Sequence, residues 1–173
     1  SCVPGAAGDT TSSLLETRKV PNLIQADGPA GLRLETPCTA IPIATTLAQS
    51  WDMDLIHRMG ELVGEEMKQL HVELWLAPGM NIHRNPLCGR NFEYYSEDPV
   101  LTGLCAATET KGVQSQKGKG TTIKHFAGNN QEDNRMFTNA HISERALREI
   151  YLKGFETAIR SAQPMAMMTS GWK

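Results

Sequence analysis

Short apolar runs alternate with amphipathic helices along this chain, and this alternation limits the possible fold more than any other feature. The apolar runs are five to seven residues long, which favours buried strands over helices. They lie at residues 22–26, 71–77, 121–126 and 165–169. Strands separated by helices in this way are typical of a parallel β/α architecture, so we expect an α/β fold.

The three predicted helices are marked by apolar spacing and by residues suited to their ends. In the first, residues 52–70, apolar side chains recur at every third or fourth position. The second begins at Asp98, a capping residue followed by proline, and extends toward Gly112. Ser143 caps the third helix, and Pro164 ends it.

Composition excludes several classes of protein. The 173 residues are 40% hydrophobic and carry a net charge of −2, which predicts a globular chain and argues against a nucleic-acid partner. The basic residues at 117–119 indicate a solvated loop. No apolar stretch reaches the roughly 18 residues of a membrane helix, so no membrane partner is expected. Four widely spaced cysteines favour reduced thiols in a cytoplasm, and no export signal is visible.

No metal or cofactor is expected either. The histidines and cysteines do not fall at metal-ligand spacing. The glycine-rich motifs that bind dinucleotides or nucleotide phosphates are missing from the sequence, as is the nucleophile-elbow motif of hydrolases. Any chemistry must therefore come from the side chains themselves.

Polar segments that contain glycine follow the first three strands, and in a β/α barrel such loops share the face where active sites form. Asp27 directly follows the first strand. Its carboxylate could accept hydrogen bonds from two neighbouring hydroxyls, as binding a sugar ring requires. The alternative is a purely structural Asx turn before Gly-Pro.

A long polar loop at residues 81–99 contains paired charged and aromatic residues, which indicates an ordered, functional loop. Arg90 could donate a fork of hydrogen bonds to substrate oxygens. Alternatively, Arg90 pairs with Glu93 or Glu97 and only holds the loop in place.

Lys124 and His125 end the third strand. Successive side chains of a regular strand point to opposite faces, so both can face one site only if the strand end is irregular. We expect such irregularity, including a cis peptide bond between residues that are not proline.

Longer motifs give a more specific signal. They read DGPAGLR at 27–33, APGMNIHR at 77–84, GRNFE at 89–93, SEDP at 96–99, KHFAGNNQE at 124–132 and SERALREIYL at 143–152. Taken in order, they resemble the N-terminal barrel of glycoside hydrolase family 3, in its β-glucosidase-like branch.

The resemblance implies a (β/α)8 TIM-barrel-type domain, incomplete in this chain, with residues 1–173 forming part of it and the family's second domain absent. It also implies a retaining exo-β-glucosidase that acts on β-glucosides or oligosaccharides. By motif, Asp27, Arg90, Lys124 and His125 would hold the innermost sugar, and Arg33 would shape that pocket.

Departures from the family pattern concern the reacting groups. Retaining hydrolysis needs two carboxyl groups about 5 to 5.5 Å apart. The family's nucleophilic Asp and its acid/base Glu are expected beyond Lys173, and Gly171-Trp172 stands where the family usually has Tyr-Asn. We therefore expect the isolated chain to be inactive.

Length leads to a further expectation and leaves alternatives open. A closed barrel takes about 250 residues, so this chain alone should aggregate, form oligomers through the unfinished barrel, or stay molten. A β-xylosidase of the same family is an alternative activity. A non-catalytic remnant that binds sugars is another alternative.

Overall fold

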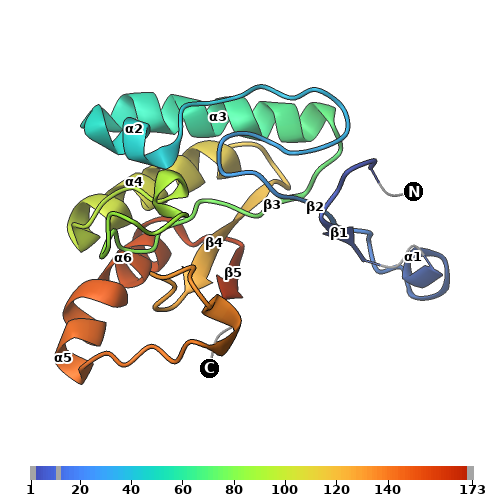
Figure 1. Cartoon of the computed structure of the whole chain (residues 1–173). Helices are drawn as coiled ribbons and strands as arrows, with labels where there is room; N and C mark the ends of the chain where they lie inside the picture. Colours follow the sequence, from blue (N-terminus) through green and yellow to red (C-terminus); the bar gives the residue numbers. More distant parts are fainter. Residues whose placement is uncertain (1–2, 11–12, 171–173) are drawn as a thin grey trace.

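A computed structural model of the chain describes residues 3–10 and 13–170, and its centre is a curved five-stranded sheet (Figure 1). The strands follow one another across the sheet in the order β1-β2-β3-β4-β5. Neighbours from β2 to β5 are parallel, and β1 is antiparallel to β2. Their bounds are Gly8–Asp9, Ile24–Ala26, Leu74–Trp75, Gly120–Phe126 and Ala166–Thr169.

Helices connect each parallel strand to the next and pack beside the sheet (Figure 1). Over the described residues the sheet does not close, so the fold is an incomplete TIM-barrel-type domain, as predicted. The α-helices are α1 Ser13–Arg18, α2 Ala44–Gln49, α3 Met53–Gln69, α4 Pro99–Gln114, α5 Glu144–Ala146 and α6 Lys153–Ala162. The described residues also contain two 3-10 turns, η1 Asn91–Glu93 and η2 Arg135–Phe137, and a π-helical turn, η3 Leu147–Tyr151.

Capping residues begin three of the helices, and two of these residues, Asp98 and Ser143, were predicted from the sequence. The Asp52 carboxylate accepts a hydrogen bond from the Leu55 amide at 2.9 Å, and Asp98 accepts one from the Val100 amide at 2.7 Å. Ser143 Oγ accepts a bond from the amide of Ala146. Each cap satisfies an amide that has no partner within the first turn of its helix.

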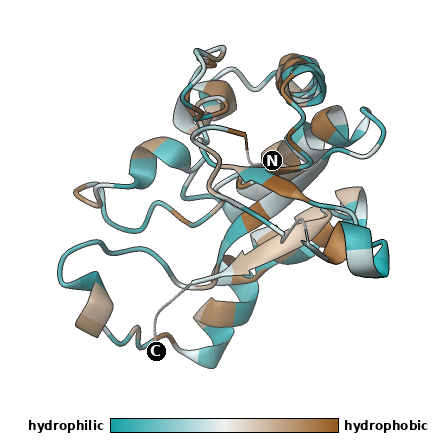
Figure 2. Ribbon diagram, turned by 90° about the vertical axis from the view of Figure 1, so that its right-hand side faces the viewer, coloured by the Kyte–Doolittle hydropathy of each residue, from teal (hydrophilic) through white to brown (hydrophobic). Residues whose placement is uncertain are grey.

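The described residues contain two apolar core clusters, and the strands of the sheet are mostly tan to brown in the hydropathy colouring (Figure 2). One cluster is centred on Ile56, Ile123 and Phe155, the other on Val63 and Trp75. These residues are at most 1% exposed. Burial of such side chains between strands and helices is the main stabilising term of a β/α fold.

Helices α3 and α4 pack with their backbones close together because glycines lie at the crossing. A β-carbon on Gly112 would lie 2.2 Å from the carbonyl oxygen of His57, and one on Gly60 would lie 2.4 Å from that of Glu109. No side chain larger than hydrogen fits at that distance, so glycine is required at both positions.

The structure differs from the sequence prediction in some elements. The helix expected after Ser143 is divided by the π-helical turn η3, and Ile150 and Ile159 are about 40% exposed (39% and 43%), so the apolar stripe is only partly buried. The strand expected at 71–77 is limited to Leu74–Trp75. The short elements β1, α1 and α2 were not predicted.

Among the described residues, no helix combines the length and the apolar character that crossing a membrane requires. Gly171 and Trp172, at which the sequence departs from the family pattern, lie outside the described residues, as does Cys2.

Candidate functional site

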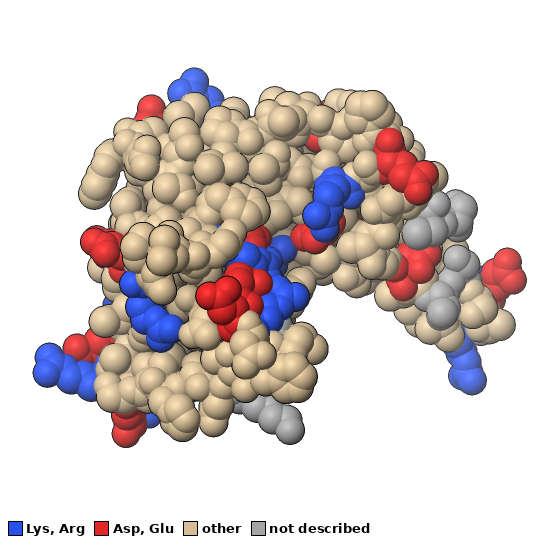
Figure 3. Space-filling model, viewed as in Figure 1, with Lys and Arg blue, Asp and Glu red and all other residues tan. Residues whose placement is uncertain are grey.

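A cleft of about 330 Å³ lies at the carboxyl ends of the parallel strands. Its polar lining comes from segments that are far apart in the sequence. In the space-filling view, Lys and Arg side chains lie beside Asp and Glu side chains in the hollow at the middle of one face (Figure 3). The lining includes Asp27, Arg90, Lys124, His125, Asn129, Arg135 and Ser170. Four of the five predicted site residues are therefore brought together.

Asp27 follows β2 and forms an ion pair with Lys124 across the cleft. Lys124 Nζ donates to Asp27 Oδ1 at 2.9 Å, and the Lys124 side chain is only 3% exposed. Burial alone would raise the pKa of Asp27, but the hydrogen bond and charge of Lys124 outweigh it and hold the pKa below its usual value. The carboxylate is thus ionised at neutral pH and can accept further hydrogen bonds.

Arg33, the fifth predicted residue, approaches the same carboxylate from outside. Its guanidinium donates to Asp27 Oδ2, yet the Arg33 side chain is 74% exposed and does not line the cleft. The loop between Asp27 and Arg33 is anchored to the core, because the indole of buried Trp75 donates to the Gly28 carbonyl at 2.9 Å. Arg33 is therefore placed to orient Asp27.

The carboxyl end of β4 is irregular, as the sequence predicted. The Lys124–His125 peptide bond is cis, the Phe126–Ala127 bond is also cis, and the register with β5 shifts between Lys124 and Phe126. Both Lys124 and His125 line the cleft. The Asn81 side chain holds this segment, accepting from the His125 amide at 2.8 Å and donating to its carbonyl at 2.9 Å.

The neighbours of His125 determine which ring nitrogen carries its proton. Arg90 contacts His125 Nε2 at 3.1 Å, and a guanidinium can only donate, so Nε2 must be the acceptor. The proton therefore lies on Nδ1, within reach of Asn81 Oδ1 at 3.3 Å and the Tyr94 hydroxyl at 3.2 Å. Burial, together with the charges of Arg90 and Lys124, lowers the pKa of His125 to about 3. The imidazole is neutral at physiological pH.

The sequence left two roles open for Arg90, binding substrate oxygens and holding its loop in place, and the contacts of Arg90 are compatible with both. Its Nε donates to the carboxylate of Glu93, which is 3% exposed, and its other arm reaches His125. Burial would lower the pKa of Arg90, but the bond to Glu93 raises it. The ion pair with Glu93 holds the guanidinium in the cleft, so the structural role and a binding role are compatible.

Several residues of the site were not singled out from the sequence. Asn81 and Tyr94 support His125, and Arg135, on η2, lines the cleft and pairs with Glu132 at 2.9 Å. Asn81 ends the glycine-containing segment after the second predicted strand, so its position was a usable signal. Nothing in local sequence indicates that Arg135 turns back toward β4.

The arrangement suits a polyhydroxylated ligand. One ionised carboxylate accepts hydrogen bonds, whereas the ammonium and guanidinium groups donate them, so both capacities of a hydroxyl group can be satisfied. No group of three or more His, Cys, Asp or Glu that could hold a metal ion occurs in residues 3–10 and 13–170.

Comparison with known proteins gives a consistent result. Residues 7–172 match the profile described as the glycosyl hydrolase family 3 N terminal domain. The chain is 46% identical over 166 residues to thermostable beta-glucosidase B from Acetivibrio thermocellus. It is 47% identical over 169 residues to an exo-alpha-(1->6)-L-arabinopyranosidase from Bifidobacterium longum. These matches cover 89% and 90% of this chain, and 22% of each relative.

Solved structures agree. All of this chain superposes on beta-glucosidase 3B from Thermotoga neapolitana, in complex with alpha-D-glucose, with a TM-score of 0.94 and 50% identity. A beta-glucosidase from Kluyveromyces marxianus in complex with glucose gives a TM-score of 0.90 at 38% identity. The chain covers 25% and 21% of those two proteins, so it spans about a quarter of the length of the proteins that it matches.

Proposed function

Since the chain belongs to glycosyl hydrolase family 3, we propose that the whole protein removes terminal non-reducing β-D-glucosyl residues with retention of configuration. This chain would supply the innermost sugar-binding site. Several relatives bear the name beta-glucosidase, and two similar solved structures are complexes with glucose. The reaction belongs to carbohydrate metabolism and takes β-glucosides or oligosaccharides as substrates.

One observation carries the proposal: Asp27, Arg90, Lys124 and His125 converge on one cleft although up to 98 positions separate them in the sequence. In the proposed complex, the Asp27 carboxylate accepts from sugar hydroxyls while Lys124 and Arg90 donate to sugar oxygens. The neutral imidazole of His125 belongs to the same cleft wall. Interactions that strengthen as the ring distorts toward the transition state contribute to the rate.

The reacting carboxyl groups are proposed to come from elsewhere in the protein. Retaining hydrolysis needs two carboxyl groups about 5 to 5.5 Å apart. Among the described residues that line the cleft, Asp27 is the only carboxylate, and it is already engaged with Lys124 and Arg33. We therefore assign Asp27 to sugar binding, and neither the nucleophile nor the acid/base to the described part of the chain.

A pentopyranoside is the second candidate substrate. The identity to an exo-alpha-(1->6)-L-arabinopyranosidase, 47%, is close to the 46% found for thermostable beta-glucosidase B. A β-xyloside differs from a β-glucoside only in lacking the hydroxymethyl group. A pocket discriminates weakly against one missing group unless it hydrogen-bonds that group. The two activities are therefore separated by substrate preference and not by the reacting groups.

Further proposals concern surroundings and assembly. Cys38, Cys88 and Cys105 carry free thiols, which is compatible with a reducing cytoplasm. The chain expressed alone is proposed to self-associate through its open sheet. The alternative to an enzyme is a non-catalytic remnant that binds sugars, and sugar binding without turnover would support it.

The test uses the complete coding sequence that contains this chain. Nitrophenyl β-D-glucoside should be cleaved faster than the β-D-xyloside and the α-L-arabinopyranoside, with β-glucose released first. A faster pentopyranoside would favour the second candidate. A protein that binds glucose in calorimetry yet cleaves none of the three would refute the catalytic proposal and support the remnant.

A further inference from the structure

A second cavity of about 300 Å³ adjoins the cleft beneath the loop that follows β4. Asn129 and Arg135 line both spaces, so the cavity and the cleft lie side by side with these two side chains between them. Asn129 is 2% exposed, and its amide donates to the Tyr94 hydroxyl at 3.1 Å. A substituent of a ligand held in the cleft would have to pass only these two side chains to reach the second cavity.

The lining of this second cavity is cationic or neutral throughout its described residues. Arg84, Arg135 and His141 stand among amide, hydroxyl and small residues, and no Asp or Glu belongs to the lining. The cleft, by contrast, contains Asp27. The second cavity therefore has no carboxylate in its described lining that would repel an anionic ligand group.

Three side chains that line the second cavity have hydrogen-bond donors available for a ligand. The side chains of Arg84, Asn139 and His141 form no ion pair or hydrogen bond with any part of the chain that the structure describes. Arg135 is already paired with Glu132, so the available positive charge comes chiefly from Arg84. Glu132 and Asp133 line a different neighbouring cavity, which Arg84 also borders.

We propose that this second cavity binds an anionic group, a carboxylate or a phosphate, carried by the glycoside whose sugar occupies the cleft. The inference rests on the proposed function, because the sugar positions the anion. A guanidinium and neighbouring amide donors match the oxygens of such a group in geometry and charge. The anion can belong to the leaving group or to the sugar itself.

Binding is measured by calorimetry with thioglycosides, which are not cleaved. One arm compares carboxyphenyl thio-β-D-glucoside with its neutral carbamoylphenyl analogue. The other compares phenyl thio-β-D-glucuronide with phenyl thio-β-D-glucoside. In at least one arm the anionic ligand should bind about 5- to 10-fold more tightly, the range between an exposed ion pair and a charge-assisted bidentate bond. The arm that shows the preference identifies which part of the substrate carries the anion.

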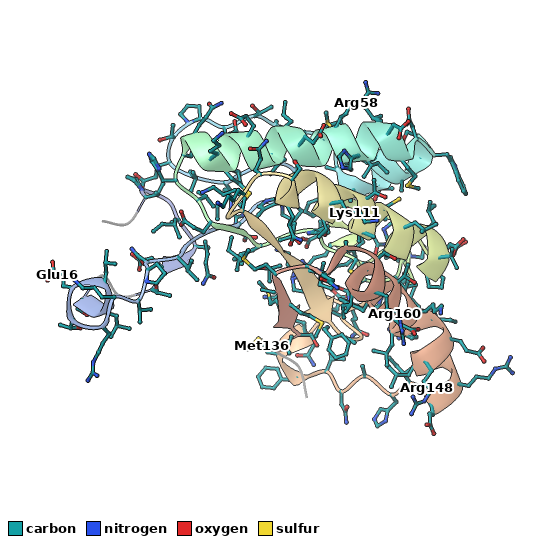
Figure 4. All side chains as sticks on the ribbon, turned by 180° about the vertical axis from the view of Figure 1, so that it is seen from behind. Glu16, Arg58, Lys111, Met136, Arg148 and Arg160 are labelled. Atoms are coloured by element: carbon teal, nitrogen blue, oxygen red, sulfur yellow. The ribbon has the colours of Figure 1, made fainter. Side chains whose placement is uncertain are left out.

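Two variants test whether the preference is local. Arg84→Gln should reduce it to less than about 2-fold while leaving the affinity for the neutral glycosides unchanged, which also shows that the variant is folded. Arg58→Gln removes the same charge from α3, on the side of the molecule away from Met136 of η2, and should keep the preference (Figure 4).

These measurements can overturn the inference that the second cavity binds an anion. Equal affinity for anionic and neutral glycosides overturns the inference and leaves the proposed function standing. So does a preference that survives Arg84→Gln, or one that Arg58→Gln removes equally. If the neutral glycosides do not bind at all, the proposed sugar site is wrong and this inference fails with it.

Discussion

The most direct perturbation of the proposed site is Asp27→Asn, which replaces a carboxylate with an amide of the same size. The wild-type carboxylate accepts from Lys124 Nζ at 2.9 Å, and its lowered pKa keeps it ionised at pH 7. The variant loses this charged acceptor. It also leaves the ammonium of Lys124, which is 3% exposed, without its counter-charge beside Arg90 and His125.

The magnitude follows from the type of bond that is lost. A hydrogen bond to a charged group contributes about 1.5 to 3 kcal/mol. At about 1.4 kcal/mol per tenfold, glucose affinity should fall by roughly 10- to 150-fold. We expect kcat/KM for an aryl β-glucoside to fall at least as much, because the bond strengthens in the transition state. Calorimetry with D-glucose and steady-state kinetics measure the two effects.

Arg33→Gln provides the matched comparison, because it removes the other ion pair of the same carboxylate. The Arg33 side chain is 74% exposed, and exposed ion pairs contribute about 0.2 to 1 kcal/mol, so affinity should fall by less than about fivefold. An Arg33→Gln loss as large as that of Asp27→Asn would refute the assignment of Arg33 to a supporting position. Unchanged affinity in Asp27→Asn would refute the sugar-binding role of Asp27.

Three further predictions concern stability and assembly. Burial raises the pKa of Glu109 to about 7, so the folded state holds a proton that the unfolded state loses near 4.5, and stability falls as pH rises between these values. The melting temperature should therefore decline from pH 5 to pH 8 in the wild type and change less in Glu109→Gln. Parallel curves for the two proteins would contradict this. Gly112→Ala should lower the free energy of unfolding, measured in urea, by about 1 to 3 kcal/mol because its β-carbon would meet a backbone oxygen at 2.2 Å. Gly8→Ala is the control and should change this free energy little, because there is open space around Gly8. Met167 is 41% exposed on edge strand β5 and should promote association of the 173-residue chain. Met167→Lys should therefore shift the size-exclusion profile of this chain toward the monomer. An unaltered profile would exclude the β5 edge as the surface of association.

Features determined by nearby residues could be predicted from the sequence. Asp98 and Ser143 cap helices at the expected positions because a cap depends on amides only two or three residues away. The alternation of strands and helices likewise predicted the parallel sheet. The short elements β1, α1 and α2 were missed because too few residues are present to show a period.

Four of the residues that line the cleft were predicted from the sequence, but their geometry was not. Asp27 and Lys124 were both expected at strand ends, but their pairing across 97 residues follows from the neighbouring positions of β2, β3 and β4 in the sheet. The tautomer of His125 depends on Arg90, which arrives from another loop. The divided helix at Leu147–Tyr151 was also unforeseen, since a continuous apolar stripe does not reveal a π-helical turn.

A crystal structure of the complete protein with D-glucose would show directly whether the cleft binds the sugar. We predict one glucose molecule in the cleft, with its hydroxyl groups within hydrogen-bond distance of Asp27 and Lys124 and with Arg90 and His125 on the surrounding wall. Glucose bound only outside this cleft, with the Asp27–Lys124 ion pair untouched, would contradict the assignment of the cleft to sugar binding.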